Sequence, residues 1–384
     1  MTPPPASAWT RSKPPLLRFL DTCLNEFSAE TSGAVADYIP ELGNADPAYF
    51  GISLATLDGH VYEVGDSRVP FTIQSMSKPF VFALALDLLG AGRVESAIGV
   101  EPSGDPFNSI RLNSDNHPFN PMVNAGAIAC TGLIYDSKGA EAFEQIRLAL
   151  SRFAGRDLAV DEAVYSSESQ TGDRNRAIGY LLKTNAVISD NVAAVLDVYF
   201  RQCAVLVTAR DIAVMAATLA NRGINPVTGE QVMSAYAISR TLSVMTSSGM
   251  YDYAGEWIYR IGIPAKSGVG GGFWRRSLPG SGSAAIRQSS TSTATAYAAS
   301  RSARRCPRIT TCTCSTAATT RATPSSPTTT SARARRGACD ARRSARSWPR
   351  TSRRCGSSSW SARCRCRRST TCRGGSRAGH GRNS

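Results

Sequence analysis

The chain has 384 residues and a formal net charge of +15, a value that would ordinarily indicate a nucleic-acid or membrane partner. The charge is unevenly distributed, because 24 of the 44 basic residues but only one of the 29 acidic residues lie after position 272. Residues 1–272 therefore carry −8 and the remainder carries +23. This mildly acidic body argues against nucleic-acid binding by residues 1–272, and no stretch reaches the ~18 apolar residues of a membrane span.

Cysteine usage and the N-terminus both bear on the compartment. Only Cys23, Cys130 and Cys203 lie in the body, too few for a disulfide framework, so a reducing compartment is expected. The first 20 residues contain no apolar run of the length that a secretory signal needs. A cytoplasmic location is the expectation.

The apolar pattern predicts the following elements in chain order. Helices are expected at about 15–27, 75–89, 141–153, 173–184, 191–201, 209–221 and 234–247. Strands are expected at 49–57 and 61–64, joined by a turn at Asp58–Gly59, and at 256–263 and 265–270. This order indicates an α/β (α+β) protein, with residues 1–24 as an N-terminal extension and 25–272 as the folded domain.

The composition changes at residue 273. Residues 273–384 contain no Val and no Lys, and their only branched aliphatic residues are Leu278, Ile286 and Ile309. Such a segment cannot bury enough apolar surface to offset its conformational entropy, so disorder is expected. Three origins compete: a basic nucleic-acid-binding tail, a metal-binding tail with its eight cysteines, and a frameshift product of a GC-rich gene, which we favour. The cysteines lack the spacing of zinc modules.

The sequence Ser75-Met76-Ser77-Lys78 carries the first candidate chemistry. Lys three residues after Ser at a helix start lies one turn away on the same face, so a neutral amine can take the hydroxyl proton. By itself the motif is weak, because Ser75 could simply cap the helix. A later Lys266-Ser267-Gly268 on an expected strand strengthens it, since this order is found in penicillin-binding proteins and class A β-lactamases.

The middle element of that signature, S-D-N, occurs twice, at residues 114–116 and 189–191. Both copies stand in polar stretches where turns and helix caps collect these residue types. Turn or capping roles are therefore predicted for both copies.

Six further blocks resemble the serine-dependent glutaminase family, of β-lactamase-like fold, over about residues 25–272. They are N-P-M-V-N-A-G-A at 120–127, S-E-S-Q-T-G-D-R-N at 167–175, L-D-V-Y-F at 196–200, M-A-A-T-L-A-N-R-G at 215–223, S-G-M-Y-D at 248–252 and P-A-K-S-G-V at 264–269. Their number and order make chance agreement untenable. The resemblance implies an antiparallel sheet flanked by helices, with a helical subdomain.

The resemblance also implies an activity and a site. The activity is hydrolysis of L-glutamine to L-glutamate and ammonia through an acyl-serine, with no metal or organic cofactor and with a homo-oligomer, dimer or tetramer, as the assembly. Catalytic roles fall to Ser75 as nucleophile, Lys78 as base and Tyr251 in proton transfer. Substrate binding falls to Ser75, Asn124, Glu168, Asn175, Tyr199, Tyr251 and the backbone at Val269, with possible support from Lys266, Ser267 and Gly268.

These assignments make chemical sense for glutamine. A carboxylate such as Glu168 can bind its α-ammonium group, and amides such as Asn124 and Asn175 can bind its α-carboxylate. Each residue taken singly also has a plain interpretation: a turn for Asn124, a solvated charge for Glu168, half-buried packing for Tyr199. The three histidines show no metal or triad arrangement.

The sequence departs from the family after G-V-G-G-G. The resemblance implies a sheet in the order 2-1-5-4-3, closed by two aliphatic strands and a helix that are not recognisable here. Without those strands Lys266 and Val269 would lack a sheet neighbour, so an inactive or poorly folded product is expected. The alternatives are therefore a damaged or basic-tailed non-enzymatic protein and, among enzymes, a β-lactamase or peptidase relative.

Overall fold

The structure is a computed structural model that describes residues 13–29, 34–277 and 281–287. Its α-helices are α1 (Pro15–Ser28), α2 (Lys78–Leu89), α3 (Ala91–Glu95), α4 (Asn124–Lys138), α5 (Ala142–Ala154), α6 (Glu162–Thr171), α7 (Asp173–Thr184), α8 (Val192–Cys203), α9 (Ala209–Ala220), α10 (Ala235–Ser248) and α11 (Ala254–Ile261). Short 3-10 helices are η1 (Pro40–Asn44), η2 (Gln74–Ser77), η3 (Gly139–Glu141) and η4 (Tyr251–Tyr253). The strands are β1 (Phe50–Thr56), β2 (Val61–Gly65), β3 (Phe71–Thr72), β4 (Leu206–Val207), β5 (Ala265–Ser267), β6 (Gly272–Ser277) and β7 (Ser281–Arg287).

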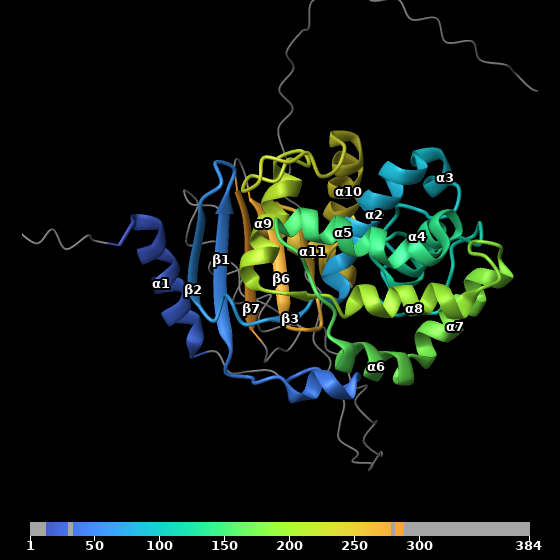
Figure 1. Ribbon diagram of the computed structural model, residues 1–384, viewed down its shortest axis with the longest axis horizontal. Coiled ribbons are helices and arrows are strands. Elements are labelled where there is room, and N and C mark those ends of the chain that lie inside the picture. The colour runs from blue at the N-terminus through green and yellow to red at the C-terminus, as the bar shows by residue number, and fades with distance from the viewer. Residues whose placement is uncertain (1–12, 30–33, 278–280, 288–384) are drawn as a thin grey trace, which may run out of the picture. The chain divides into compact units, whose positions relative to one another are not determined.

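Five strands form one antiparallel sheet in the order β2-β1-β7-β6-β5 (Figure 1). The hairpin register pairs Ile52 with Val64, and β5 joins the other edge by pairing Lys266 with Trp274. Strands β3 and β4 pair separately. The described part of the chain is mostly helical with small antiparallel sheets.

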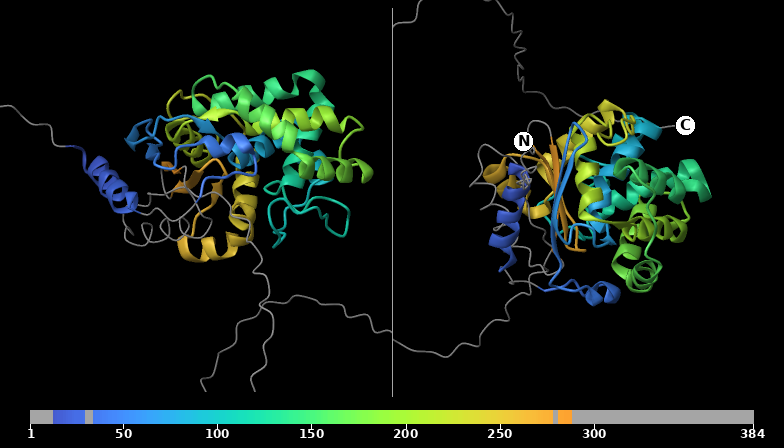
Figure 2. Two further views of the ribbon diagram at one scale, coloured as in Figure 1. Left: turned by 90° about the horizontal axis from the view of Figure 1, so that it is seen from below. Right: turned by 60° about the vertical axis from the view of Figure 1, so that its left-hand side comes forward.

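Both faces of the five-stranded sheet are covered by helices. Alternation along β1 sends Phe50, Ile52 and Leu54 into a cluster with the apolar face of α1, while Ala55 joins the main core on the other face. Figure 2 shows α1 on one side of the sheet and α9 on the other. The sheet is thus the middle layer of three.

The main core fills the space between α9 and the remaining helices. Helix α2 is apolar all round, with residues 78–86 all buried, because α4, α5 and α10 surround it. Trp274 enters this core from β6 and packs 5.3 Å, centroid to centroid, from Phe80 of α2. The sheet and the helix that follows Ser75 are therefore packed together directly.

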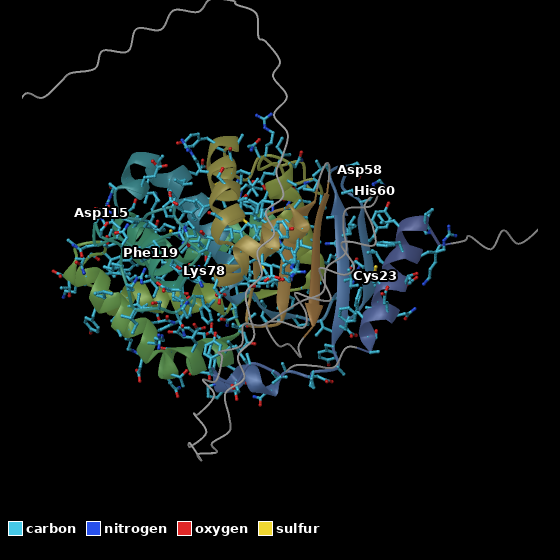
Figure 3. All side chains as sticks on the ribbon, turned by 180° about the vertical axis from the view of Figure 1, so that it is seen from behind. Cys23, Asp58, His60, Lys78, Asp115 and Phe119 are labelled. Atoms are coloured by element: carbon cyan, nitrogen blue, oxygen red, sulfur yellow. The ribbon has the colours of Figure 1, made fainter. Side chains whose placement is uncertain are left out.

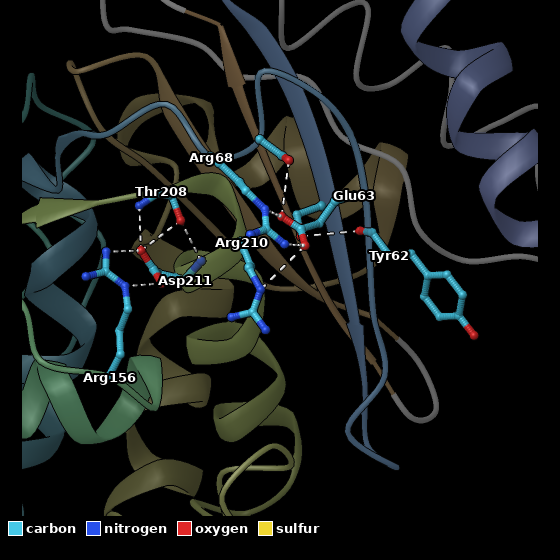
Figure 4. A network of polar contacts seen from close by, with 9 residues as sticks. Tyr62, Glu63, Arg68, Arg156, Thr208, Arg210 and Asp211 are labelled. Carbon is cyan, nitrogen blue, oxygen red and sulfur yellow. Dashed lines mark hydrogen bonds and ion pairs between the residues drawn. The ribbon is translucent and has the colours of Figure 1, made fainter.

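Ion pairs join the start of α9 to its surroundings (Figure 4). Asp211 completes a capping box with Thr208 and accepts two hydrogen bonds, of 2.6 and 2.8 Å, from Arg156. On the neighbouring strand β2, Glu63 accepts from Arg68 and pairs with Arg210 of α9 at 3.5 Å. These contacts fix α9 relative to the edge of the sheet.

The expectation that two closing strands are missing is wrong. Strands β6 and β7 lie between the hairpin and β5, in the order that the family resemblance implies. Sheet pairing uses backbone amides and carbonyls, so it tolerates a segment poor in aliphatic residues. Phe273 and Trp274 still supply buried side chains at 1% and 0% exposure. The expected closing helix and residues 288–384 lie outside the described residues.

A second expectation also fails: residues 256–263 form most of helix α11 rather than a strand. The β-branched and aromatic residues there suggest a strand locally, but Ala254 and Trp257 lie three apart and bury one helical stripe. Helices α3, α4 and α6 were not predicted, and Ser75 lies in η2, one turn before α2 begins at Lys78, although the helix was predicted to begin at Ser75. The remaining predicted helices and the hairpin are present within one to three residues.

Candidate active site

Ser75 lies in the middle of η2, at the junction of the sheet and α2. The preceding Gln74 has φ +48°, an uncommon left-handed conformation for a residue other than glycine. Gly268 at the end of β5 lies against this turn: a Cβ added there would lie 3.1 Å from the carbonyl oxygen of Ile73. The close approach of β5 to η2 is therefore possible because position 268 has no side chain.

Lys78 is buried and contacts the Ser75 hydroxyl. Its Nζ lies 2.7 Å from Ser75 Oγ and 2.7 Å from Asn124 Oδ1. Burial lowers the pKa of Lys78 to about 8, although Cys203 and Glu168 oppose this shift. A substantial neutral fraction near neutral pH is what a general base requires.

Two amides continue the polar chain from Lys78. Asn124, the first residue of α4, donates from Nδ2 to Asn175 Oδ1 at 3.0 Å, and its backbone amide donates to the carbonyl of Phe107. Asn175 lies in the first turn of α7. The plain interpretation of Asn124 as a turn residue is wrong, because it begins a buried helix.

Glu168 is a carboxylate buried to 5% exposure on α6. Its Oε2 has no hydrogen-bond partner within the part of the chain that is described. Burial raises the pKa of Glu168 to about 8, opposed by Gln74 and by the charge of Lys78. Burial thus disfavours the charged form of Glu168 and leaves Oε2 without a partner, and a cationic ligand group that pairs with this oxygen would restore the charged form. The interpretation of Glu168 as a solvated charge is excluded.

The half-buried Tyr251 and the buried Lys266 form a second pair. Lys266 Nζ lies 2.7 Å from Tyr251 Oη and 2.8 Å from the Ser267 carbonyl oxygen, and it stands 3.9 Å from the centre of the Tyr251 ring. Burial, and then the charge of Lys78, lowers the pKa of Lys266 well below its usual range. Burial raises the pKa of Tyr251, opposed by its interaction with Ser75. The phenol of Tyr251 therefore stays protonated.

Five of the predicted site residues line one pocket, whereas Lys78, Tyr251, Lys266, Ser267, Gly268 and Val269 are not among its lining residues. Ser75, Asn124, Glu168, Asn175 and Tyr199 all line it. Val269 instead packs its side chain with Ile39 and Leu42 and lines a neighbouring pocket. Only the Val269 backbone, directly after Gly268, remains near the turn of Ser75.

Several lining residues were not predicted. These are Tyr38, Ile39, Gln74, Phe107, Asn108, Thr171, Gly172, Arg174 and Cys203. Thr171, Gly172 and Arg174 stand inside a block that the sequence singled out, and Cys203 follows another, so their proximity in sequence was a usable signal. Tyr38 and Phe107 come from irregular segments far away in sequence, and no local pattern marks them.

The two S-D-N copies have the turn and capping roles predicted for them. Asn191 caps α8 by accepting from the amide of Ala194, and Asn116 has φ +61° in a turn. Figure 3 shows Asp115 well away from Lys78, and the Asp58–His60 pair lies on the opposite side at the hairpin. Within residues 13–29, 34–277 and 281–287, no three His, Cys, Asp or Glu side chains gather as a metal site would require.

The Ser–Lys pair at a helix start, the buried Lys266 on an edge strand and the antiparallel sheet fit the class of hydrolases that the sequence resemblance implies. The glutaminase family model matches residues 33–287, which includes β6 and β7. The chain belongs to the glutaminase family.

Named relatives agree with this assignment. Glutaminase 2 of Bradyrhizobium diazoefficiens is 70% identical over 266 residues, which are 69% of this chain and 43% of that protein. The glutaminase of Microcystis aeruginosa is 49% identical over 259 residues, covering 67% of this chain and 77% of the relative. The chain thus spans less than half of the first relative and about three quarters of the second.

Solved structures show the same fold. The native form of Mglu superposes with a TM-score of 0.73 at 40% identity, over 77% of this chain and 72% of that one. The probable glutaminase YbaS gives 0.72 at 35% identity, over 76% of this chain and 96% of that one. Family match and relatives together support glutaminase activity. No helix in the described parts of the chain has the length and apolar content to cross a bilayer.

Proposed function

We propose that this chain hydrolyses L-glutamine to L-glutamate and ammonia through an acyl-enzyme on Ser75. The observation that carries the proposal is the 2.7 Å contact between Lys78 Nζ and Ser75 Oγ inside a pocket that also holds the orphaned carboxylate of Glu168. We also assign the chain to the β-lactamase-like fold, in which a sheet is combined with a helical subdomain.

In acylation, neutral Lys78 takes the proton of Ser75 while Oγ attacks the side-chain amide carbon of glutamine. A tetrahedral intermediate forms, and the C–N bond breaks to release ammonia. The lowered pKa of Lys78 supplies the neutral amine, and backbone groups near Val269 support the negative oxygen. Water then attacks the acyl-serine carbonyl and gives its proton to the Tyr251 phenolate. The ester bond breaks, the Lys78 ammonium returns its proton to Ser75 Oγ, and glutamate is released.

Tyr251 is assigned to donate a proton to the leaving nitrogen. Its raised pKa favours the protonated phenol, and Lys266 holds the phenol oxygen by a hydrogen bond from Nζ. The role is therefore general-acid catalysis, in which a donor that stays protonated until the transition state is required.

Different residues bind the two charged groups of the substrate. Glu168 binds the α-ammonium group, because its buried Oε2 lacks a partner and gains one from the ligand. Asn175 binds the α-carboxylate as an amide donor, and Asn124 links that group to Lys78. Tyr199, buried to 2% exposure, forms a wall of the pocket.

The family resemblance supports a homo-oligomer, dimer or tetramer, and the cysteine pattern supports a cytoplasmic location. Cys23, Cys130 and Cys203 are all buried. Light scattering of the purified chain tests the assembly state, and fractionation of the expressing cell tests the compartment. A monomeric chain or an exported one would contradict these two proposals.

Ammonia release from L-glutamine by the full chain and by its Ser75→Ala variant tests the proposed function. We expect release by the parent and loss of nearly all activity in the variant, with unchanged circular dichroism. The exposed-loop control Ser96→Ala should retain the parent's rate. A parent without activity, or a Ser75→Ala variant at the parent's rate, contradicts the proposal.

A further inference from the structure

Helix α6 carries Glu168 but is weakly anchored by apolar packing. Of its ten residues only Val164 and Glu168 are buried. Side-chain packing normally provides most of a helix's stability and fixes its position. The position of the Glu168 carboxylate, which lacks a partner at Oε2, must therefore depend on other contacts of α6.

Arg201 of α8 is the centre of those contacts. Its guanidinium stands 4.1 Å from the centre of the Tyr165 ring, and it pairs with Glu162 at 3.7 Å, so it contacts α6 twice. Its Nε donates to Asp197 Oδ2 at 3.2 Å within α8. Tyr165 Oη donates to the other oxygen of Asp197, which closes the cluster.

The cluster and one wall of the pocket are formed by the same two helices, α6 and α8. Tyr165 precedes Glu168 by three residues on α6, so the two side chains lie about one turn apart. Asp197 and Arg201 flank Tyr199, which lines the pocket, on α8. A shift of α6 on α8 would thus displace Glu168 relative to Tyr199.

We propose that the cluster of Glu162, Tyr165, Asp197 and Arg201 positions Glu168 to bind the α-ammonium group of the substrate. The proposal deepens the proposed function and rests on it for the identity of the ligand. These four side chains do not touch the substrate; they are positioning residues. Exposed ion pairs contribute little one at a time, but here a stacked guanidinium and a shared carboxylate act together.

Further contacts hold α6 besides the cluster. The amide of Asp161, the N-cap of α6, donates to the carbonyl of Ala204 at 2.9 Å. The amide of Glu41 donates to Ser167 Oγ at 3.3 Å, and Arg176 donates to the carbonyl of Ser169. Loss of the cluster therefore tilts α6 rather than releasing it.

The test compares two ligands that differ only in the ammonium group, L-glutamate and glutarate. Titration calorimetry on the full chain gives a Kd for each. In Arg201→Met we expect the Kd of L-glutamate to rise about fivefold, the effect of roughly 1 kcal/mol, while that of glutarate changes less than about twofold. Tyr165→Phe should change the ratio of the two Kd values in the same direction. This variant replaces Arg201→Met in the test if Arg201→Met does not fold.

Arg147→Met is the matched control. Arg147 is also a partly buried arginine on a helix, paired with Glu144 at 2.7 Å and with Asp157, but it lies on α5 away from α6. It should leave both constants within about twofold of the parent. Equal weakening of both ligands by Arg201→Met, an equal effect of Arg147→Met, or no binding of L-glutamate by the parent would overturn the proposal. Ammonia release by the parent is measured separately, so failure of the proposed function is recognised independently.

Discussion

The amine of Lys78 lies 2.7 Å from the hydroxyl of Ser75, one helical turn away and out of contact with bulk water. Burial allows Lys78 to act as a base in this contact, because the desolvated amine loses its proton at a lower pH than an exposed lysine does. The same burial makes every other charge in the pocket depend on a partner.

The rate of acylation should increase with pH through about 8. Burial lowers the pKa of Lys78 to about 8, so the amine is protonated below that pH and becomes the neutral base above it. A plot of kcat/KM for L-glutamine between pH 6 and 9.5 checks this, with enzyme stability confirmed at each pH. A rate that is constant or falls across this range would contradict the assignment of Lys78.

Glu168→Gln should weaken substrate binding more than it slows the chemical step. The amide keeps the shape of the side chain but removes the charge that attracts the α-ammonium group. We expect KM for L-glutamine to rise about 10- to 100-fold, from the loss of a charge-assisted hydrogen bond, with a smaller change in kcat. Steady-state kinetics measure this, and Glu144→Gln on the exposed face of α5 is the control. An unchanged KM would exclude the role assigned to Glu168.

Tyr251→Phe should lower kcat by about 10²- to 10⁴-fold, the usual contribution of a general acid. The ring remains, so its 5.3 Å contact with Phe107 is retained, while Lys266 loses its hydrogen bond to the phenol oxygen. KM should change little. Initial rates of ammonia release provide the test, with Tyr259→Phe, at a residue 89% exposed, as the control. Parent-like turnover in Tyr251→Phe would assign the proton transfer to another group.

Trp274→Ala should destabilise the domain by about 3–5 kcal/mol, the usual cost of removing a large buried aromatic side chain. Trp274 is fully buried between β6 and Phe80 of α2. Denaturant unfolding followed by circular dichroism measures the change in free energy, and Tyr259→Ala at the surface should change it by less than about 0.5 kcal/mol. A Trp274→Ala chain as stable as the parent would mean that β6 is not part of the core.

Local patterns were sufficient where a segment's own residues decide its structure. The sequence predicted the hairpin of β1 and β2 and the helices around 173–184 and 209–221, because a turn or a cap with one apolar stripe is a short-range property. It failed for residues 254–261, where Trp257 and its neighbours favour a strand locally but bury a helical stripe against β6.

The site residues likewise fall into those that the sequence predicted and those that only the structure revealed. The sequence by itself identified the glutaminase family and predicted Ser75, Asn124, Glu168 and Tyr251 as site residues. Only the tertiary structure decided that Tyr38 and Phe107 join the pocket, and that strands β6 and β7 complete the sheet although they are poor in aliphatic residues. The physical reason is the distance along the chain. Secondary-structure propensity depends on a few neighbouring residues, whereas burial and strand pairing are set by partners more than a hundred residues away.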